Sequence, residues 1–372
     1  MARFVYNVYY GTTSTPTTQL SNVQSVNVNV GRQSALEQYS ANTAAFTIRY
    51  PSGYASPITT LVPGNYIEIR TEIPGNGYGE SNLFLGQIKD VAATYGIPYA
   101  SNVGPADYLD VTCEGHFAAL GRAPGNNYVM AAGNFNTQTN TATTQSSCQI
   151  DALSGFGAES SMGGTTVDNT WGDWANKCAL TFNGRILDAG ASISIVNQYY
   201  KSPTNYGNFS DVTKSDTLHP YDAITFDSLS DNYFTQVTVD PESYAAQTVT
   251  TGVAPFRVLQ MNTFNSSTGQ ASDFATYLLS AYGTQKFAIS AISVNLNNVN
   301  RTPAYGAFYG PGAQVSVAFR GTTYQCIIEG ARWSGTPDSA AVTFYVSGAD
   351  LNNYLLLDNT VYGKLDNNKL GY

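Results

Sequence analysis

Charged residues are scarce in this chain. Asp, Glu, Lys and Arg make up 12% of its 372 residues, about half of the roughly 25% that is usual in soluble proteins. The 26 acidic and 17 basic side chains give a formal net charge of −9. Such a surface repels phosphate groups, so duplex nucleic acid is a poor candidate for a specific ligand. The charge is replaced by Asn, Thr, Ser, Gly and 27 tyrosines, a composition that favours an extracellular or virion all-β protein over a cytosolic metabolic enzyme.

Long apolar runs are also absent. The sequence has no stretch of 18 consecutive apolar residues, so it predicts no membrane span. The N-terminal residues Met1–Asn7 carry one basic side chain and no sustained apolar run, so we expect no signal peptide there. The overall apolar content of 42% is nevertheless enough for substantial buried cores, which excludes a disordered protein.

Histidine is limited to His116 and His219. Neither is accompanied by a Gly-x-Ser-x-Gly turn or by metal-ligand spacing, so we interpret both as structural or solvent-facing. The sequence also has no P-loop and no strand-linked Gly-x-Gly-x-x-Gly. It therefore predicts no catalytic, cofactor-binding or metal-binding residue, no cofactor and no enzymatic activity.

Cysteine is rare and scattered. No Cys-x-x-Cys pair and no neighbouring histidine accompanies the four cysteines, Cys113, Cys148, Cys178 and Cys326. We expect buried free thiols in a protein made in a reducing cytoplasm, with one disulfide pair as the alternative.

The most suggestive cluster for chemistry is Trp171-Gly172-Asp173-Trp174. Aromatic rings stack on sugars and a carboxylate binds hydroxyl groups, so this cluster fits a carbohydrate-binding or glycosidase site. The alternative is that the two tryptophans pack a domain interface. Spacing alone names no catalytic carboxylate pair.

Strand patterns dominate both ends of the chain. Apolar and polar residues alternate with a period of two, as in half-buried strands, over residues 23–30, 45–50, 66–70, 83–91, 108–113, 288–296, 314–319, 324–329 and 341–346. Turn residues separate these runs. They predict antiparallel sheets, and we expect the N-terminal one to close as a small barrel.

The middle of the chain has a different pattern. Residues 134–144 are mostly Asn, Thr and Gln and predict a surface loop. Ser147 is placed to cap a short helix over residues 148–153, and Ser272 a longer one over Asp273–Tyr282 that ends at Gly283.

The two ends resemble each other, which indicates an internal repeat. Ile67-x-Ile69 matches Val315-x-Val317, and Phe84-x-Gly86-x-Ile88 matches Tyr324-x-Cys326-x-Ile328. The same comparison aligns Tyr95 with Trp333, the strand of residues 109–113 with that of 342–346, and the strand of residues 26–30 with that of 292–296. Related barrels at the two ends of the chain explain this, although any two antiparallel meanders share a period of two.

Several runs in this order resemble the minor tail proteins that form the tail hub, or baseplate hub, of tailed bacteriophages. They are residues 31–39 (GRQSALEQY), 44–48, 63–69, 83–90 and 109–115, with Trp333, 346–350 and 357–359 near the other end. The terminal string of residues 363–372, GKLDNNKLGY, is the most specific part, whereas residues 121–265 match nothing in that family.

The resemblance implies a mainly β fold with two tail-tube-like antiparallel β-barrels in one chain and a mixed α/β intermediate region. The expected divisions are an N-terminal tube-like barrel (1–118), an inserted domain or arm (119–215), a connecting region with one helix (216–285) and a C-terminal barrel with a terminal arm (286–372).

The resemblance also implies a structural role at the virion tail tip. Three subunits with two barrels each would adapt a sixfold tail tube to a threefold tip and line the DNA exit channel. Its partners would be a tail tube or distal tail protein above and a spike, fibre or receptor-binding protein below, and assembly would take place in the host cytoplasm. The alternatives are a hexameric distal-tail adaptor and a carbohydrate-binding adhesin or glycosidase of the tail tip.

Overall fold

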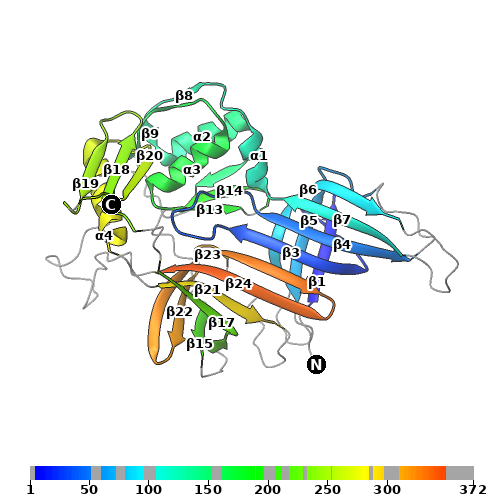
Figure 1. The fold of residues 1–372 in the computed structure, drawn as a ribbon. Coiled ribbons are helices and arrows are strands. Elements are labelled where there is room, and N and C mark those ends of the chain that lie inside the picture. The colour runs from blue at the N-terminus through cyan, green and yellow to red at the C-terminus, as the bar shows by residue number, and fades with distance from the viewer. Residues whose placement is uncertain are drawn as a thin grey trace.

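The computed structural model describes residues 5–51, 60–72, 80–95, 106–152, 161–188, 190–196, 207–211, 218–228, 233–252, 254–284, 288–296 and 310–348. The protein is mainly β, and one continuous sheet of fourteen strands forms its largest part (Figure 1). No closed barrel is present among the described residues. The predicted segments 349–350, 357–359 and 363–372 lie outside them.

The first half of the sheet uses strands from the N-terminal third of the chain. They are β1 (Val5–Gly11), β2 (Thr18–Gln19), β3 (Val23–Gly31), β4 (Thr43–Pro51), β5 (Tyr66–Glu72), β6 (Ser81–Thr94) and β7 (Ala106–Glu114). Their order is β2-β1-β5-β6-β7-β4-β3, and all neighbours are antiparallel. The alternating sequence sets the two faces: in β3, Val26 and Val28 are buried while Asn27 and Asn29 are exposed.

The second half uses later strands. They are β15 (Gly207–Ser210), β16 (Leu218–Pro220), β17 (Ala223–Asp227), β21 (Ala288–Asn295), β22 (Gln314–Phe319), β23 (Thr322–Thr336) and β24 (Ser339–Gly348). Five of them, β17-β21-β22-β23-β24, have the same chain order and the same neighbours as β3-β4-β5-β6-β7. At the edge the halves differ, since β15 runs parallel to β22 whereas β1 runs antiparallel to β5.

The pairing register confirms the repeat. Ile67 lies opposite Gly86 as Val315 lies opposite Cys326. Each half has a bulge directly after the matching isoleucine, Ile88 or Ile328.

The turn that enters each matching strand is also the same. Gly64 has φ +92° and Gly312 has φ +91°, a region that glycine adopts at little cost. The Gly64 N–H donates to the Ile88 carbonyl at 2.9 Å, and the Gly312 N–H donates to the Ile328 carbonyl at 2.7 Å.

Two of the predicted correspondences are wrong. The strand with Ile292 and Val294 matches β4, not β3, because β21 lies against β24 where β4 lies against β7. The counterpart of β3 is therefore β17. Counting from the bulge, Trp333 matches Ala93 rather than Tyr95. A period of two recurs in every strand, so it identifies strands without identifying their neighbours.

The two halves join through β3 and β23, which pair from Gly31 opposite Gly330 to Val26 opposite Gly335. Figure 1 shows the resulting sheet running across the molecule. The edge of β3 is therefore covered by β23 of the same chain.

The predicted N-terminal barrel is an open, curled sheet. The Tyr6 hydroxyl of β1 reaches across and donates to the Ser334 carbonyl of β23 at 3.1 Å, and a groove of about 210 Å³ separates β1 from β3 at this seam. The second half curls as well, since the Phe226 ring of β17 lies 5.2 Å from the Phe319 ring of β22. A single apolar core runs through both halves.

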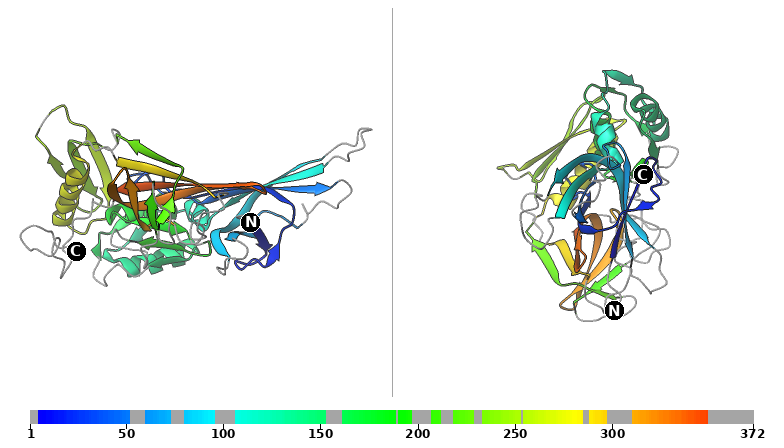
Figure 2. Two further views of the ribbon diagram at one scale, coloured as in Figure 1. Left: turned by 90° about the horizontal axis from the view of Figure 1, so that it is seen from below. Right: turned by 90° about the vertical axis from the view of Figure 1, so that its right-hand side faces the viewer.

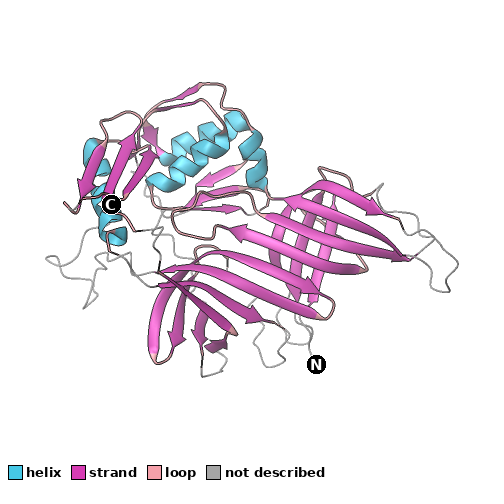
Figure 3. Cartoon of the chain, viewed as in Figure 1, coloured by secondary structure: helices cyan, strands magenta, loops and turns pink. Residues whose placement is uncertain are grey.

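A helical region packs beside the sheet (Figure 3). It contains α1 (His116–Arg122), α2 (Phe135–Ser146), α3 (Trp171–Thr181) and the short strands β8 (Tyr128–Met130), β9 (Gly133–Asn134), β10 (Ile150–Ala152), β11 (Ser161–Met162), β12 (Thr165–Val167), β13 (Arg185–Asp188) and β14 (Ile193–Val196). It has its own core, with Phe135, Trp171 and Trp174 fully buried.

Two predictions in this region are wrong. Most of the expected loop of residues 134–144 is helix α2, which Asn134 caps by accepting from the Thr137 N–H at 2.7 Å. The expected helix after Ser147 is instead strand β10, which pairs with β14, and residues 153–160 lie outside the description.

A small sheet and one long helix complete the fold. Strands β18 (Gln236–Pro241), β19 (Gln247–Thr250) and β20 (Val258–Thr263) pack against α4 (Thr268–Tyr282), and Figure 2 shows this unit at the end of the molecule away from β6 and β7. The helix predicted over residues 273–282 is confirmed and ends at Gly283, but Ser267 caps it rather than Ser272.

Candidate functional site: the junction of the two half-sheets

The two half-sheets meet at a pair of facing glycines, Gly31 and Gly330. Gly31 has φ +73°, and a Cβ there would lie 2.3 Å from the Glu329 carbonyl oxygen. A Cβ at Gly330 would lie 2.5 Å from the Arg32 carbonyl oxygen. Neither position accommodates a side chain without shifting the backbone, so glycine allows the strands to meet here.

Directly beside these glycines, Glu329 is completely buried at the bulge of β23. Its carboxylate accepts from Arg32 Nε at 2.9 Å and from Arg185 Nη2 at 2.7 Å. The Ser347 hydroxyl donates to the same carboxylate at 2.6 Å. A buried carboxylate needs such partners, because desolvation without them costs several kcal/mol.

The electrostatics keep Glu329 charged. Burial by itself raises the pKa of a carboxyl group, but the guanidinium groups of Arg185 and Arg32 outweigh it and lower the pKa of Glu329 to about 2. Two cations against one anion leave a net positive charge. The Arg32 guanidinium lies over the face of the Tyr39 ring, 4.6 Å from its centroid, and this cation–π contact stabilises the positive charge.

The cluster links separate parts of the fold. Arg32 follows β3 in the first half-sheet, Glu329 belongs to β23 in the second, and Arg185 begins β13 in the helical region. Because Glu329 is deprotonated and enclosed, it is unsuited to proton transfer. The arrangement fixes the junction in place.

His219 is buried and His116 is half-buried. His116 begins α1, where its main-chain N–H donates to the Asp188 carboxylate at 3.0 Å, and His219 lies in β16 beside the Phe209 ring. Burial lowers the pKa of both imidazoles, and at His116 the nearby Asp188 charge opposes this effect. Their positions fit the structural interpretation, and His219 is not solvent-facing.

The tryptophan cluster forms no sugar platform. Trp171 and Trp174 are 1% and 2% exposed, and their rings pack edge to face with centroids 5.9 Å apart. Asp173 forms a capping box with Thr170 at the start of α3. The carbohydrate interpretation of these residues is therefore wrong, and both tryptophans serve the core of the helical region.

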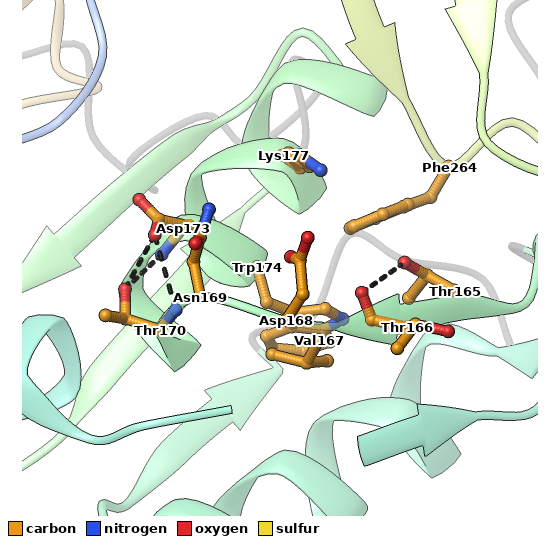
Figure 4. Close-up of a pocket in the computed structure, with 10 residues that line it drawn as sticks. All are labelled: Thr165, Thr166, Val167, Asp168, Asn169, Thr170, Asp173, Trp174, Lys177 and Phe264. Atoms are coloured by element: carbon orange, nitrogen blue, oxygen red, sulfur yellow. Dashed lines mark hydrogen bonds between the residues drawn. The ribbon is translucent and has the colours of Figure 1, made fainter. Parts of the chain in front are cut away.

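The cavity beside this cluster is small (Figure 4). It lies between β12, α3 and Phe264 and has a volume of about 20 Å³, roughly that of one water molecule. Lys177 donates to Glu242 at 2.5 Å across its rim. The space is too small for a sugar ring or a cofactor.

All four cysteines are buried free thiols, as predicted. Burial raises the pKa of Cys113 and Cys178, which makes both poor nucleophiles. Within the described ranges, no cluster of three or more His, Cys, Asp or Glu side chains is suited to hold a metal. No described helix is long and apolar enough to cross a membrane.

The sequence analysis did not identify the Glu329 cluster, although it singled out a run that contains some of its residues. The run of residues 31–39, quoted above for its resemblance, contains Gly31, Arg32 and Tyr39, and all three lie at the junction. Arg32 and Glu329 are 297 positions apart, so no local pattern pairs them.

No known protein family matches the sequence, and no curated protein does. Solved structures do match over nearly the full chain. The tail protein from Neisseria meningitidis MC58 superposes with a TM-score of 0.63 at 11% identity, covering 94% of this chain and 98% of the other. The 43 kDa tail protein of prophage MuSo2 from Shewanella oneidensis gives 0.62 at 11% identity, covering 94% and 99%.

This chain has the fold of phage tail proteins. A chain of the lidded Francisella PdpA–VgrG complex is also similar, with a TM-score of 0.50 at 8% identity, covering 93% of this chain and 52% of the other. At these identities the likeness establishes the fold, and it agrees with the resemblance drawn from the sequence.

Proposed function

We propose that this protein is a structural tail hub protein of a phage virion, which adapts a sixfold tail tube to a threefold tip. The observation that carries the proposal is the duplicated half-sheet, with the same strand order, glycine turn and bulge in both copies. Two equivalent units per chain let three chains present six equivalent units around one axis.

A second part of the proposal is that the exposed face of the sheet lines the DNA channel. A row of small uncharged side chains crosses this face from strand to strand through Ser334, Asn27, Ala45 and Thr112. Lys and Arg are what bind phosphates, and this row has none. The same face also carries exposed Arg332 and Arg49, with Asp110 between the row and Arg49, so its charges are mixed and offer no continuous basic track to hold DNA.

The proposed partners are a tail tube or distal tail protein on one side of the ring and a spike, fibre or receptor-binding protein on the other. The proposal gives the protein no catalytic role. Incubation with peptidoglycan and host polysaccharide should release no product, and hydrolysis abolished by changing one Asp or Glu would overturn this part.

The experiment for the hub itself is the number of copies around the axis, by cryo-microscopy of the particle. Threefold symmetry at this protein supports the hub. Six copies would favour a hexameric distal-tail adaptor, with one functional unit per subunit, and a single copy would refute both.

A further inference from the structure

The internal repeat shows which strand edge of the first half corresponds to the junction. In the second half, β22 covers β23 from Thr322 to Ile327, and beyond the bulge β3 covers Gly330–Gly335. In the first half, β5 covers β6 from Ser81 to Gln87. Beyond the bulge, at residues 90–94, no described strand pairs with β6 on that side.

The other edge of the junction also has a counterpart. β3 pairs with β4 on one side and with β23 on the other. Its equivalent, β17, pairs with β21 at Ala223, Ile224 and Thr225, and among the described strands none pairs with the second side of this segment. Within the described part of the chain there is thus one complete junction, and one matching strand edge of each kind has no strand partner.

We propose that residues 92–94 of β6 pair antiparallel with residues 225–227 of β17 in a second copy of this chain, which repeats between subunits part of the β23–β3 junction seen within one. The proposal rests on the trimeric hub proposed above and names its subunit interface. Such contacts are head-to-tail, and they close into a ring when the rotation per subunit divides the circle.

The internal junction also fixes the register. Ser334 lies opposite Asn27. Their equivalents, counted through the matched ladders, are Thr94 and Thr225. Thr94 should therefore lie opposite Thr225 of the partner subunit, and all four of these side chains are exposed in the single chain.

The chemistry of the two edges fits this contact. Residues 92–95 and 224–226 contain no charged side chain, and Asp227 is the one charge in this contact. Charges are the usual guard on an open strand edge, so the edge is weakly guarded. One position further along, Tyr95 is 58% exposed and comes opposite Ile224 of the partner subunit. Pairing would bury both apolar surfaces, and such cross-strand pairs stabilise sheets.

Cysteine cross-linking of the full-length protein tests the interface. Directly opposed strand residues lie within disulfide reach, and the four natural cysteines are buried. The double variant Thr94→Cys with Thr225→Cys should, on mild oxidation, migrate at two and three times the mass of one chain, and reduction should reverse this. Mixing the two single variants should give covalent dimers.

The matched positive control is Asn27→Cys with Ser334→Cys, which must cross-link within one chain at unchanged mass. The negative control pairs Thr94→Cys with Thr166→Cys, an exposed residue of β12, and should give no oligomer. If native mass shows a trimer but the Thr94–Thr225 pair does not cross-link while the positive control does, the interface is wrong and the hub stands. If native mass shows only a monomer at every concentration, both fail.

Discussion

Glu329 places a carboxylate with no exposed surface between two guanidinium groups. Replacing it by Gln would keep the shape and remove the charge, which leaves two buried cations without a counter-ion. We expect the Glu329→Gln variant to lose about 3–5 kcal/mol of unfolding free energy, measured by urea denaturation.

The matched control for this variant is Glu114→Gln. Glu114 pairs with Arg122, whose side chain is 61% exposed, and exposed pairs contribute at most about 1 kcal/mol. A cost at Glu329 no larger than that at Glu114 would contradict the view that this cluster holds the junction.

The same cluster predicts a pH dependence. The pKa of Glu329 falls from an ordinary value of 4.5 to about 2 in the folded protein, so the folded state favours the deprotonated form. Its contribution is complete above the unfolded pKa and is lost as the pH falls from about 4.5 towards 2.

The stability difference between the wild type and Glu329→Gln should therefore be constant above pH 5 and shrink below it. Urea unfolding of both proteins at pH 7, 4 and 3 measures this difference. A gap that stays the same down to pH 3 would show that Glu329 is not held in its charged form.

At the scale of elements, the two halves should respond alike to equivalent changes. Gly64 and Gly312 have nearly the same positive φ in equivalent turns, and alanine in the left-handed region costs about 1–2 kcal/mol. We expect Gly64→Ala, at an exposed position, to lose that amount of unfolding free energy, and Gly312→Ala, at a buried position, to lose at least as much.

Gly121, in helix α1, is the control for the glycine pair. A Cβ there meets nothing within 4 Å, and alanine favours a helix over glycine by up to about 1 kcal/mol. Gly121→Ala should therefore be neutral or stabilising in the same denaturation experiment. No loss of unfolding free energy at either Gly64 or Gly312 would contradict the equivalence of the two turns.

The strands were largely predictable from sequence, because a strand buried on one face has alternating apolar and polar residues. Ile67 and Ile69, for example, are both fully buried. Helix α2 was not predictable, since its polar Thr and Asn residues show no apolar stripe. Tertiary contacts of the buried Phe135 and Ala142 stabilise it instead. Within the helix, the Thr139 hydroxyl donates a hydrogen bond to the Phe135 carbonyl.

The site was less predictable than the strands. The cluster at Glu329 joins Arg32 and Arg185, at separations of 297 and 144 positions, and it depends on which strands become neighbours. The alternating pattern that reveals a strand is the same in every strand. It therefore led to the wrong counterpart of β3 in the second half of the repeat. The tryptophan cluster shows the converse error, because a suggestive local motif proved to be core packing.

At the scale of the whole molecule, the uncharged row across the sheet should matter for DNA passage. We expect particles assembled with Asn27→Lys and Thr112→Lys to release their genome more slowly than the wild type, because lysines in the channel would bind phosphates. The rate of DNA release from purified particles measures this. A lysine at Thr248, exposed on the small sheet, is the control and should leave the rate unchanged.

The central claim is that the duplicated half-sheet makes this protein one third of a ring. Native mass spectrometry of the hub subassembly, released intact from the tail, counts the copies most directly. We predict three copies of the chain. Six copies, or one, would contradict the account.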